Sequence, residues 1–182
     1  KELLSHQDYC SFMRSLNMKQ RAFAMYHRKW CKDTVIALKQ GKKTKPYRVF
    51  LSGPGGVGKS HVINIVYNDA VRLLRLAGGF SPEEAIAILT APTGVAAYNI
   101  GGMTLHHAFC LNFQRFGSGY MPIPAARLPQ VMGTLGNMQL LITDEISMVG
   151  ADTLLTVYRR LCDIKGTRKP KEKKSAQQQS SD

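Results

Sequence analysis

The hydrophobic pattern predicts two long helices in the first half of the chain. From Leu16 to Gln40, apolar and aromatic side chains recur at three- and four-residue spacing, with basic residues on the other face, which is typical of an amphipathic helix. Asn17 is suited to cap its N-terminus. From Ser60 to Leu76, apolar residues cover most of a helix surface until Gly78 and Gly79 stop the pattern. We therefore expect this second helix to be buried against a sheet.

Three short apolar runs predict strands, at Tyr47 to Leu51, Ile86 to Thr90 and Gln139 to Thr143. A further amphipathic helix is expected over Ala151 to Ile164. Strands that alternate with helices predict an α/β fold in which a parallel sheet has right-handed crossovers and flanking helices. Because three strands make only a small sheet, we expect a fold that is incomplete at its C-terminal side.

The other segments predict turns, a loop and a tail. Ser81, Pro82 and Glu84 favour a capping-box turn before the second strand. A proline-rich loop is expected over residues 117–129, followed by a weak helix near Val131 to Leu135. Beyond Gly166 the chain consists almost entirely of polar residues, so we expect a disordered tail over residues 166–182.

Composition and charge narrow the class of protein. With 182 residues, 44% of them hydrophobic and 20% charged, the chain fits one globular domain with a real core. The formal net charge is +13, of which residues 1–48 contribute +9, residues 147–182 contribute +4, and residues 49–146 contribute nothing. Basic ends suit a polyanion such as nucleic acid, although a solvated basic surface explains the same count without any partner.

Several classes of protein are disfavoured. The longest uncharged stretch, Ala85 to Gln114, contains Pro92 and several glycines, so we expect no transmembrane helix and no membrane partner. The first ten residues include Asp8 and lack an apolar run, which does not support a secretory signal. The four cysteines are far apart and lack zinc-site spacing, so we expect reduced thiols in the cytosol or nucleus, and no metal cage.

One glycine-rich segment has the pattern of a phosphate-binding loop. It matches G-x-x-x-x-G-K-S/T between a predicted strand and a predicted helix, and it reads Gly53-Pro54-Gly55-Gly56-Val57-Gly58-Lys59-Ser60. In such a loop, backbone N–H groups converge on a phosphate and the helix adds its positive dipole end. We expect Lys59 to reach the terminal phosphates of ATP and Ser60 to ligate Mg²⁺. The alternative is a glycine-rich turn without a ligand, which the flanking elements disfavour.

An acidic pair follows the third predicted strand. Asp144 and Glu145 come directly after Thr143, so a parallel sheet delivers them to the same edge as the phosphate loop. Asp144 is then expected to reach the metal, and Glu145 is the candidate general base for the attacking water. Alone, such a pair is more often a solvated turn. Together with the loop it indicates an NTPase site.

Three blocks of sequence resemble the Pif-type DNA helicases of superfamily 1, which also occur in Helitron-like transposons. The blocks are LSGPGGVGKS from Leu51, APTGVAAYNIGGMTLHHAF from Ala91 and LLITDEISMVG from Leu140. The resemblance covers about Leu16 to Ile164. It implies a RecA-like P-loop motor domain that uses ATP and Mg²⁺ and moves 5′ to 3′ on single-stranded DNA. It also implies roles in DNA repair, recombination and telomere maintenance, and we expect a nuclear location, with a mitochondrial one in addition.

The resemblance divides the chain and assigns further residues. It implies a basic helical region at 1–45 that holds an adenine-contacting glutamine, Gln20, then a partial RecA-like ATPase domain at 46–165 and the polar tail. A surface glutamine on a helix is the alternative for Gln20. The positions that the family places near the DNA strand correspond to Thr93, Asn99, Thr104 and His106, whose groups can hold phosphates without reading sequence. For Phe109 a core position is favoured over base stacking.

The chain also departs from the family pattern. After Ile164 the family continues into a phosphate-sensing glutamine and a second RecA-like domain that supplies an arginine finger, and the polar tail stands in that place here. Because arginine fingers typically contribute about 10³ to 10⁵ in rate, the chain alone should hydrolyse ATP very slowly. The alternative hypotheses are a truncated, transposon-derived module that binds ATP and DNA without catalytic work, and a different P-loop ATPase such as a DNA-dependent loader.

Overall fold

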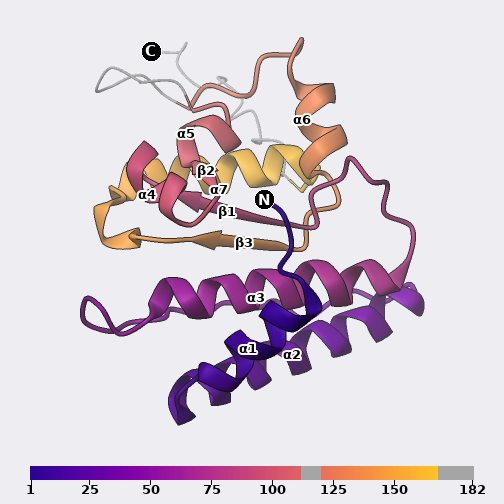
Figure 1. The fold of residues 1–182 in the computed structure, drawn as a ribbon. Helices are drawn as coiled ribbons and strands as arrows, with labels where there is room; N and C mark the ends of the chain where they lie inside the picture. Colours follow the sequence, from indigo (N-terminus) through magenta and orange to yellow (C-terminus); the bar gives the residue numbers. More distant parts are fainter. Residues whose placement is uncertain (112–119, 168–182) are drawn as a thin grey trace, which may run out of the picture.

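The computed structural model describes residues 1–111 and 120–167, which form a small parallel sheet between layers of helices (Figure 1). In chain order the elements are α1 (His6–Ser15), α2 (Met18–Lys39), α3 (Lys59–Leu74), η1 (Arg75–Ala77), β1 (Ala87–Ala91), α4 (Gly94–Asn99), β2 (Met103–Thr104), α5 (Leu105–Ala108), α6 (Leu128–Leu135), β3 (Leu140–Thr143), η2 (Ile146–Met148) and α7 (Ala151–Ile164). Helices α1 and α2 form an outer layer, and α3 lies between that layer and the sheet. Helices α4, α5 and α7 lie beyond the sheet.

The sheet has the order β2-β1-β3, and both pairings are parallel. Strand β1 is the central strand, with Ala87 opposite Leu140 and Thr90 opposite both Thr143 and Met103. All five of its residues are buried, which is typical of a parallel strand covered on both faces. The fold is therefore α/β, with a parallel sheet and flanking helices, as the alternation of apolar runs predicts.

Alternate side chains of β1 belong to two separate hydrophobic cores. Ala87 and Leu89 pack with the α2–α3 layer, whereas Ile88 packs with α5, α6 and α7. This division follows from the two-residue period of a strand. Phe109 is fully buried in the second core, which agrees with the predicted core position. None of the described helices combines the length and the hydropathy needed to cross a membrane.

The long helices agree closely with the periodic pattern. Helix α2 is capped by Asn17, whose side chain accepts a hydrogen bond from the backbone N–H of Gln20. Helix α3 ends in a 3₁₀ turn that stops at Gly78, where φ is 80°. Helix α7 has the predicted bounds, and α6 begins a few residues before the predicted weak helix. Helix α1 and strand β2 are not indicated by the pattern. Most of the predicted tail, and part of the predicted loop at 117–129, lie outside the described residues.

The predicted turn before β1 is present, although no helix follows it. The backbone N–H of Ser81 donates to the Glu84 side chain at 2.9 Å, and the N–H of Glu84 donates to the Ser81 carbonyl oxygen at 3.2 Å. Only the first is a capping-box contact, because a capping box would pair the Glu84 N–H with the Ser81 side chain and not with its backbone carbonyl oxygen. Here the two hydrogen bonds close a turn and lead into the strand.

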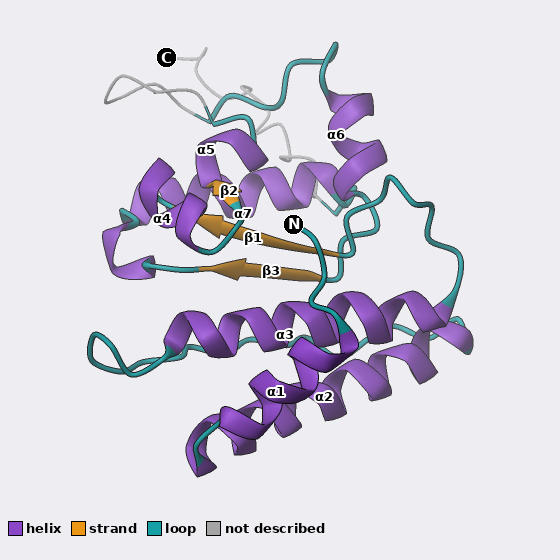
Figure 2. Cartoon of the chain, in the orientation of Figure 1, coloured by secondary structure: helices purple, strands orange, loops and turns teal. Residues whose placement is uncertain are grey.

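The prediction of a buried strand at residues 47–51 is wrong. This segment is drawn as a loop between α2 and α3 (Figure 2), and in the described structure it is not paired with the free edge of β3. Val49, Phe50 and Leu51 are exposed, Phe50 to 75%. The physical reason lies at the two ends of the segment. Its first residue, Tyr47, is held on α2 by ring contacts, and Gly53, two residues beyond its end, accepts a hydrogen bond from Lys59.

Candidate nucleotide-binding site

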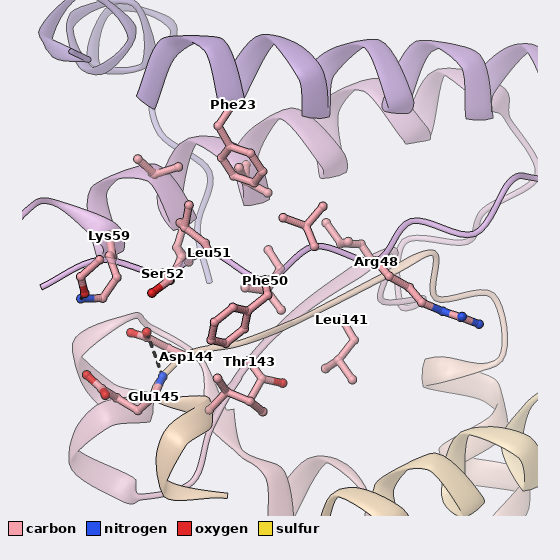
Figure 3. Close-up of a pocket in the computed structure, with 18 of the residues that line it drawn as sticks. Phe23, Arg48, Phe50, Leu51, Ser52, Lys59, Leu141, Thr143, Asp144 and Glu145 are labelled. Carbon is pink, nitrogen blue, oxygen red and sulfur yellow. Dashed lines mark hydrogen bonds between the residues drawn. The ribbon is translucent and has the colours of Figure 1, made fainter. Parts of the chain in front are cut away.

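A cavity of about 760 Å³ lies between the 47–53 segment, α3 and the end of β3. Its polar end contains Lys59, Asp144 and Glu145, which lie near one another in Figure 3. Apolar side chains from α2, the 47–53 segment, α3, β3 and α7 form most of the remaining wall, among them Phe23, Phe50, Leu141 and Leu154. Sequence reasoning did not assign these apolar residues to the site, because only the tertiary structure brings them together.

The phosphate loop connects the 47–53 segment to α3. Gly56 and Gly58 have φ values of 74° and 83°, in the left-handed region that glycine adopts without strain. Gly58 is also the N-cap of α3, so the loop delivers Lys59 and Ser60 as the first two helical residues. The unsatisfied N–H groups of the first helical turn and the positive dipole end therefore lie beside the loop, as an anion site requires.

Lys59 is held by the loop itself. Its Nζ donates hydrogen bonds to the carbonyl oxygens of Gly53 at 2.8 Å and Pro54 at 2.9 Å. Gly53 and Lys59 line the cavity, whereas Ser60 is exposed at the adjoining position of the helix. The ammonium group is thus positioned at the mouth of the loop, at the end of the cavity that holds the carboxylates (Figure 3).

The acidic pair follows the last residue of β3. The backbone N–H of Asp144 donates to the carbonyl oxygen of Thr90 at 2.9 Å, which continues the β1–β3 pairing by one residue. The Asp144 carboxylate accepts a hydrogen bond of 3.0 Å from the backbone N–H of Glu145. Glu145 is exposed and has φ 50° and ψ 42°, a left-handed conformation that is uncommon outside glycine and is often found at functional sites.

A threonine pair braces the strands beneath these carboxylates. The buried Thr90 hydroxyl donates to the carbonyl oxygen of Ile142 at 3.0 Å and lies 3.0 Å from the hydroxyl of Thr143. Thr90, the next-to-last residue of β1, and Thr143, the last residue of β3, are therefore joined by side chains as well as by the backbone. No local sequence pattern indicates this bridge, because the two threonines are 53 positions apart.

Gln20 lies next to the phosphate loop. Its Nε2 donates to the carbonyl oxygen of Val57 at 2.9 Å, and its Oε1 accepts from the backbone N–H of Asn17 at 3.0 Å. The second bond completes a capping box at the start of α2. The structure thus places Gln20 beside the phosphate loop, and its side chain is also part of a helix cap.

The four residues assigned to DNA contact lie around α4 and α5. Thr93 and Thr104 are the N-caps of these helices, and their side chains accept hydrogen bonds from Ala96 at 3.2 Å and His107 at 3.1 Å. Thr93 and Asn99 are exposed, while Thr104 and His106 are half-buried. Both threonines therefore have a structural role, and their contact with DNA stays a prediction.

The described residues contain no group of three or more His, Cys, Asp or Glu side chains that could hold a metal ion by themselves. Carboxylate oxygens of Asp144 and the Ser60 hydroxyl are ligand types that Mg²⁺ accepts, and Mg²⁺ is commonly bound by one or two protein groups together with phosphates. The residues present therefore fit an ion that arrives with a nucleotide.

The fold and the site define a class of protein. A phosphate loop that starts a helix, with an acidic pair at the carboxyl end of a parallel strand, is the arrangement of P-loop nucleotide-binding proteins. Comparison of sequences then identifies the family, because the family model described as PIF1-like helicase matches residues 31–176. The chain belongs to the PIF1-like helicase family.

Its relatives are much longer proteins. The human ATP-dependent DNA helicase PIF1 is 38% identical over 112 residues, which cover 59% of this chain and 15% of the human protein. The ATP-dependent DNA helicase Pif1 of Campylobacter jejuni is 32% identical over 121 residues, which cover 62% of this chain and 24% of that protein. The chain therefore spans only a small part of these relatives. No solved structure matches it significantly.

Proposed function

We propose that this chain is the first motor domain of an ATP-dependent DNA helicase that moves 5′ to 3′ on single-stranded DNA. The observation that supports this function is that Lys59 and Asp144, from opposite parts of the sequence, line the same end of one cavity. A lysine that neutralises phosphates and a carboxylate that binds a metal are the two charged groups that an ATP site requires. The relatives named as ATP-dependent DNA helicases support the choice of substrate.

Each residue of the site has a role in this proposal. The backbone of residues 53–58 cradles the phosphates, and Lys59 leaves the carbonyl oxygens of Gly53 and Pro54 to contact the terminal phosphates. Ser60 and Asp144 hold Mg²⁺, which neutralises charge on the phosphates when it is bound. Glu145 accepts a proton from the attacking water, and its exposed position leaves room for that water. Gln20 contacts the adenine edge.

The DNA strand is proposed to lie over α4 and α5. Exposed Thr93 and Asn99 and half-buried Thr104 and His106 offer hydroxyl, amide and imidazole groups to the phosphates. Backbone contacts of this kind suit a protein that moves along DNA of any sequence. The work of such a helicase belongs to genome maintenance, including repair, recombination and telomere maintenance, in the nucleus or the mitochondrion.

Nucleotide binding is the property that tests this function. Titration calorimetry of the chain with Mg-ATP should give binding in the micromolar range, and Lys59→Ala should abolish it because the main phosphate contact is lost. Arg127→Ala is the matched control, since Arg127 is exposed and outside the cavity wall. Equal binding by the Lys59→Ala variant and the unchanged chain would refute the proposal.

A second candidate is a module that binds ATP and DNA without catalytic work. The matched segment covers 15% of the human protein, so nucleotide binding and strand unwinding by this stretch need separate tests. The family's second RecA-like domain supplies an arginine finger, so the chain alone is proposed to hydrolyse ATP very slowly. Strand displacement on a 5′-tailed duplex separates the two candidates. Unwinding by the purified chain would exclude the binding module, and its absence together with tight nucleotide binding would favour it.

A further inference from the structure

A second surface combines exposed lysines with a cluster of aromatic rings. We call it the connector surface, because it joins the outer face of α2 to the connector that follows this helix. It consists of Tyr26, Trp30, Lys42, Lys43, Lys45 and Tyr47. The three lysines are exposed, Tyr26 is 60% exposed, and Trp30 and Tyr47 are half-buried.

The rings hold the connector against α2. Trp30 and Tyr47 are stacked, with centroids 4.6 Å apart and ring planes at 25°, and Tyr26 extends the cluster at 6.0 Å from Tyr47. The indole N–H of Trp30 donates to the carbonyl oxygen of Lys45 at 3.3 Å, and the Nδ1 atom of His27 lies 3.3 Å from the Tyr47 hydroxyl. The backbone that carries the lysines is therefore fixed relative to an aromatic platform whose outermost ring is open to solvent.

The charge around this platform is strongly one-sided. Residues 28–48 contain eight lysines and arginines and a single acidic residue, Asp33. Two of the arginines face elsewhere, since Arg28 donates to the Tyr9 hydroxyl and Arg48 lies in the wall of the nucleotide cavity. Six exposed lysines remain, three on α2 (Lys29, Lys32 and Lys39) and the three of the connector. Charge alone would suit any polyanion, whereas charge beside exposed aromatic faces suits a polyanion that carries bases.

The connector surface is distant from the proposed DNA path over α4 and α5. Helix α2 belongs to the outermost layer, and α3 and the sheet lie between it and those two helices (Figure 1). A contact at the connector surface therefore uses none of the residues around α4 and α5. Tyr47 also lines the nucleotide cavity, so this ring is common to both sites, whereas Tyr26, Trp30 and the three connector lysines lie outside the cavity wall.

We propose that the connector surface is a second binding site for single-stranded nucleic acid. Lys42, Lys43 and Lys45 neutralise successive phosphates, and the Tyr26 ring stacks on a base. Each phosphate contact on a single strand adds about 0.7 to the slope of log affinity against log salt, and stacking on an aromatic ring is worth about 1–3 kcal/mol per base. This site goes beyond the proposed function, because binding there requires neither ATP nor translocation of the protein along the strand.

The lysines are tested by charge reversal in the full chain. Binding of a fluorescent oligothymidine of about 20 nucleotides is measured by anisotropy over a range of salt concentrations. The variant Lys42→Glu/Lys43→Glu/Lys45→Glu should weaken binding at least about tenfold and lower the salt slope by about 2, since three contacts are lost. The control Lys19→Glu/Arg75→Glu/Arg127→Glu changes the net charge equally at three exposed positions elsewhere. Equal losses in the two variants would overturn the site.

The aromatic platform is tested with a ligand that lacks bases. Tyr26→Ala should weaken oligothymidine binding about fivefold, the lower limit of the range for base stacking, and should leave binding of an abasic oligonucleotide of equal length unchanged. Equal losses for both ligands would overturn the stacking contact. Because Tyr26 and the lysines are exposed, circular dichroism and calorimetric Mg-ATP binding should be those of the unchanged chain. Because ATP binding is expected to be retained in these variants, failure of this test can be distinguished from failure of the nucleotide-site test.

An anionic membrane is the competing partner for the lysines. Vesicles of phosphatidylserine and phosphatidylcholine should compete with the oligonucleotide weakly, and Tyr26→Ala should not change that competition. Tight vesicle binding that depends on the three lysines, with oligonucleotide binding unaffected by their reversal, would overturn the proposal in favour of a lipid surface.

Discussion

The side-chain amide of Gln20 donates a hydrogen bond to the carbonyl oxygen of Val57, 2.9 Å away, and so joins the start of α2 to the phosphate loop. The carbonyl oxygen of the same side chain accepts from the backbone of Asn17. Both polar atoms of Gln20 are therefore engaged within the protein. Under the proposed function, reading adenine would require the amide to exchange the Val57 carbonyl oxygen for the base, which would couple base recognition to the shape of the loop.

We predict that Gln20→Ala selectively weakens binding of ATP. The variant should bind ATP about tenfold more weakly, the value of one or two good hydrogen bonds, while binding of GTP changes little. Asn17→Ala is the control, since it removes the same capping box at a cost of about 1 kcal/mol without touching the base. Calorimetry with ATP and with GTP measures how much the affinity for each nucleotide changes in the variant. An equal loss for ATP and GTP would show that Gln20 only orients the loop.

Stability should fall in mild acid because of His27. Burial, the largest cause, lowers the pKa of this imidazole to about 4, so the folded protein keeps it neutral at pH values where the unfolded chain, with a pKa near 6.5, is protonated. Relative to its value above pH 6.5, the free energy of unfolding should fall by about 3 kcal/mol as the pH drops to 4, because protons then bind the unfolded chain more readily than the folded one.

Urea unfolding at a series of pH values measures this loss. His27→Phe should be less stable than the unchanged chain at pH 7, because the Tyr47 hydroxyl loses its partner, but its stability should fall less between pH 6.5 and 4. The exposed His107, replaced by Gln, should leave the profile unchanged. A parallel fall in the unchanged chain and His27→Phe would contradict the assignment.

Gly102 should be irreplaceable at the edge of the sheet. A Cβ atom at this position would lie 2.4 Å from the carbonyl oxygen of Leu89, so Gly102→Ala must separate β2 from β1. We expect a loss of about 2–4 kcal/mol in the free energy of unfolding. Gly133, inside α6, has no atom near its Cβ position, and Gly133→Ala should stabilise by about 0.5–1 kcal/mol. Thermal unfolding compares the stabilities of the two variants. An unchanged stability of Gly102→Ala would disprove the close approach of Gly102 to the backbone of Leu89.

Two phenylalanines test the position of the 47–51 segment. Phe50 is 75% exposed, so Phe50→Ser should change the free energy of unfolding by less than about 0.5 kcal/mol. Phe109 is fully buried in the second core, and Phe109→Ala should cost about 3–5 kcal/mol. Urea unfolding of both variants provides the comparison. A cost of several kcal/mol for Phe50→Ser would mean that the segment is a buried strand in solution.

Much of the fold could be predicted because local periodicity and local chemistry agree. The apolar spacing along α2, α3 and α7 and the strands expected from the apolar runs at β1 and β3 are each confirmed. Strand β2 is only two residues long, so it has no period to detect. The 47–51 segment has the pattern of a strand, but pairing with a neighbour decides whether an extended segment becomes one, and such pairing is not written in the segment itself.

The sequence by itself determined the chemistry of this protein. The spacing of the phosphate loop and the acidic pair after an apolar run predict a nucleotide site, because those groups work only in that local order. The tertiary structure decided what surrounds them: that Gln20 contacts the loop, that Thr90 and Thr143 brace the carboxylates, and that Trp30 and Tyr47 hold a lysine-rich connector on α2. These contacts join residues that are distant along the chain, and only packing of the whole fold determines which of them meet.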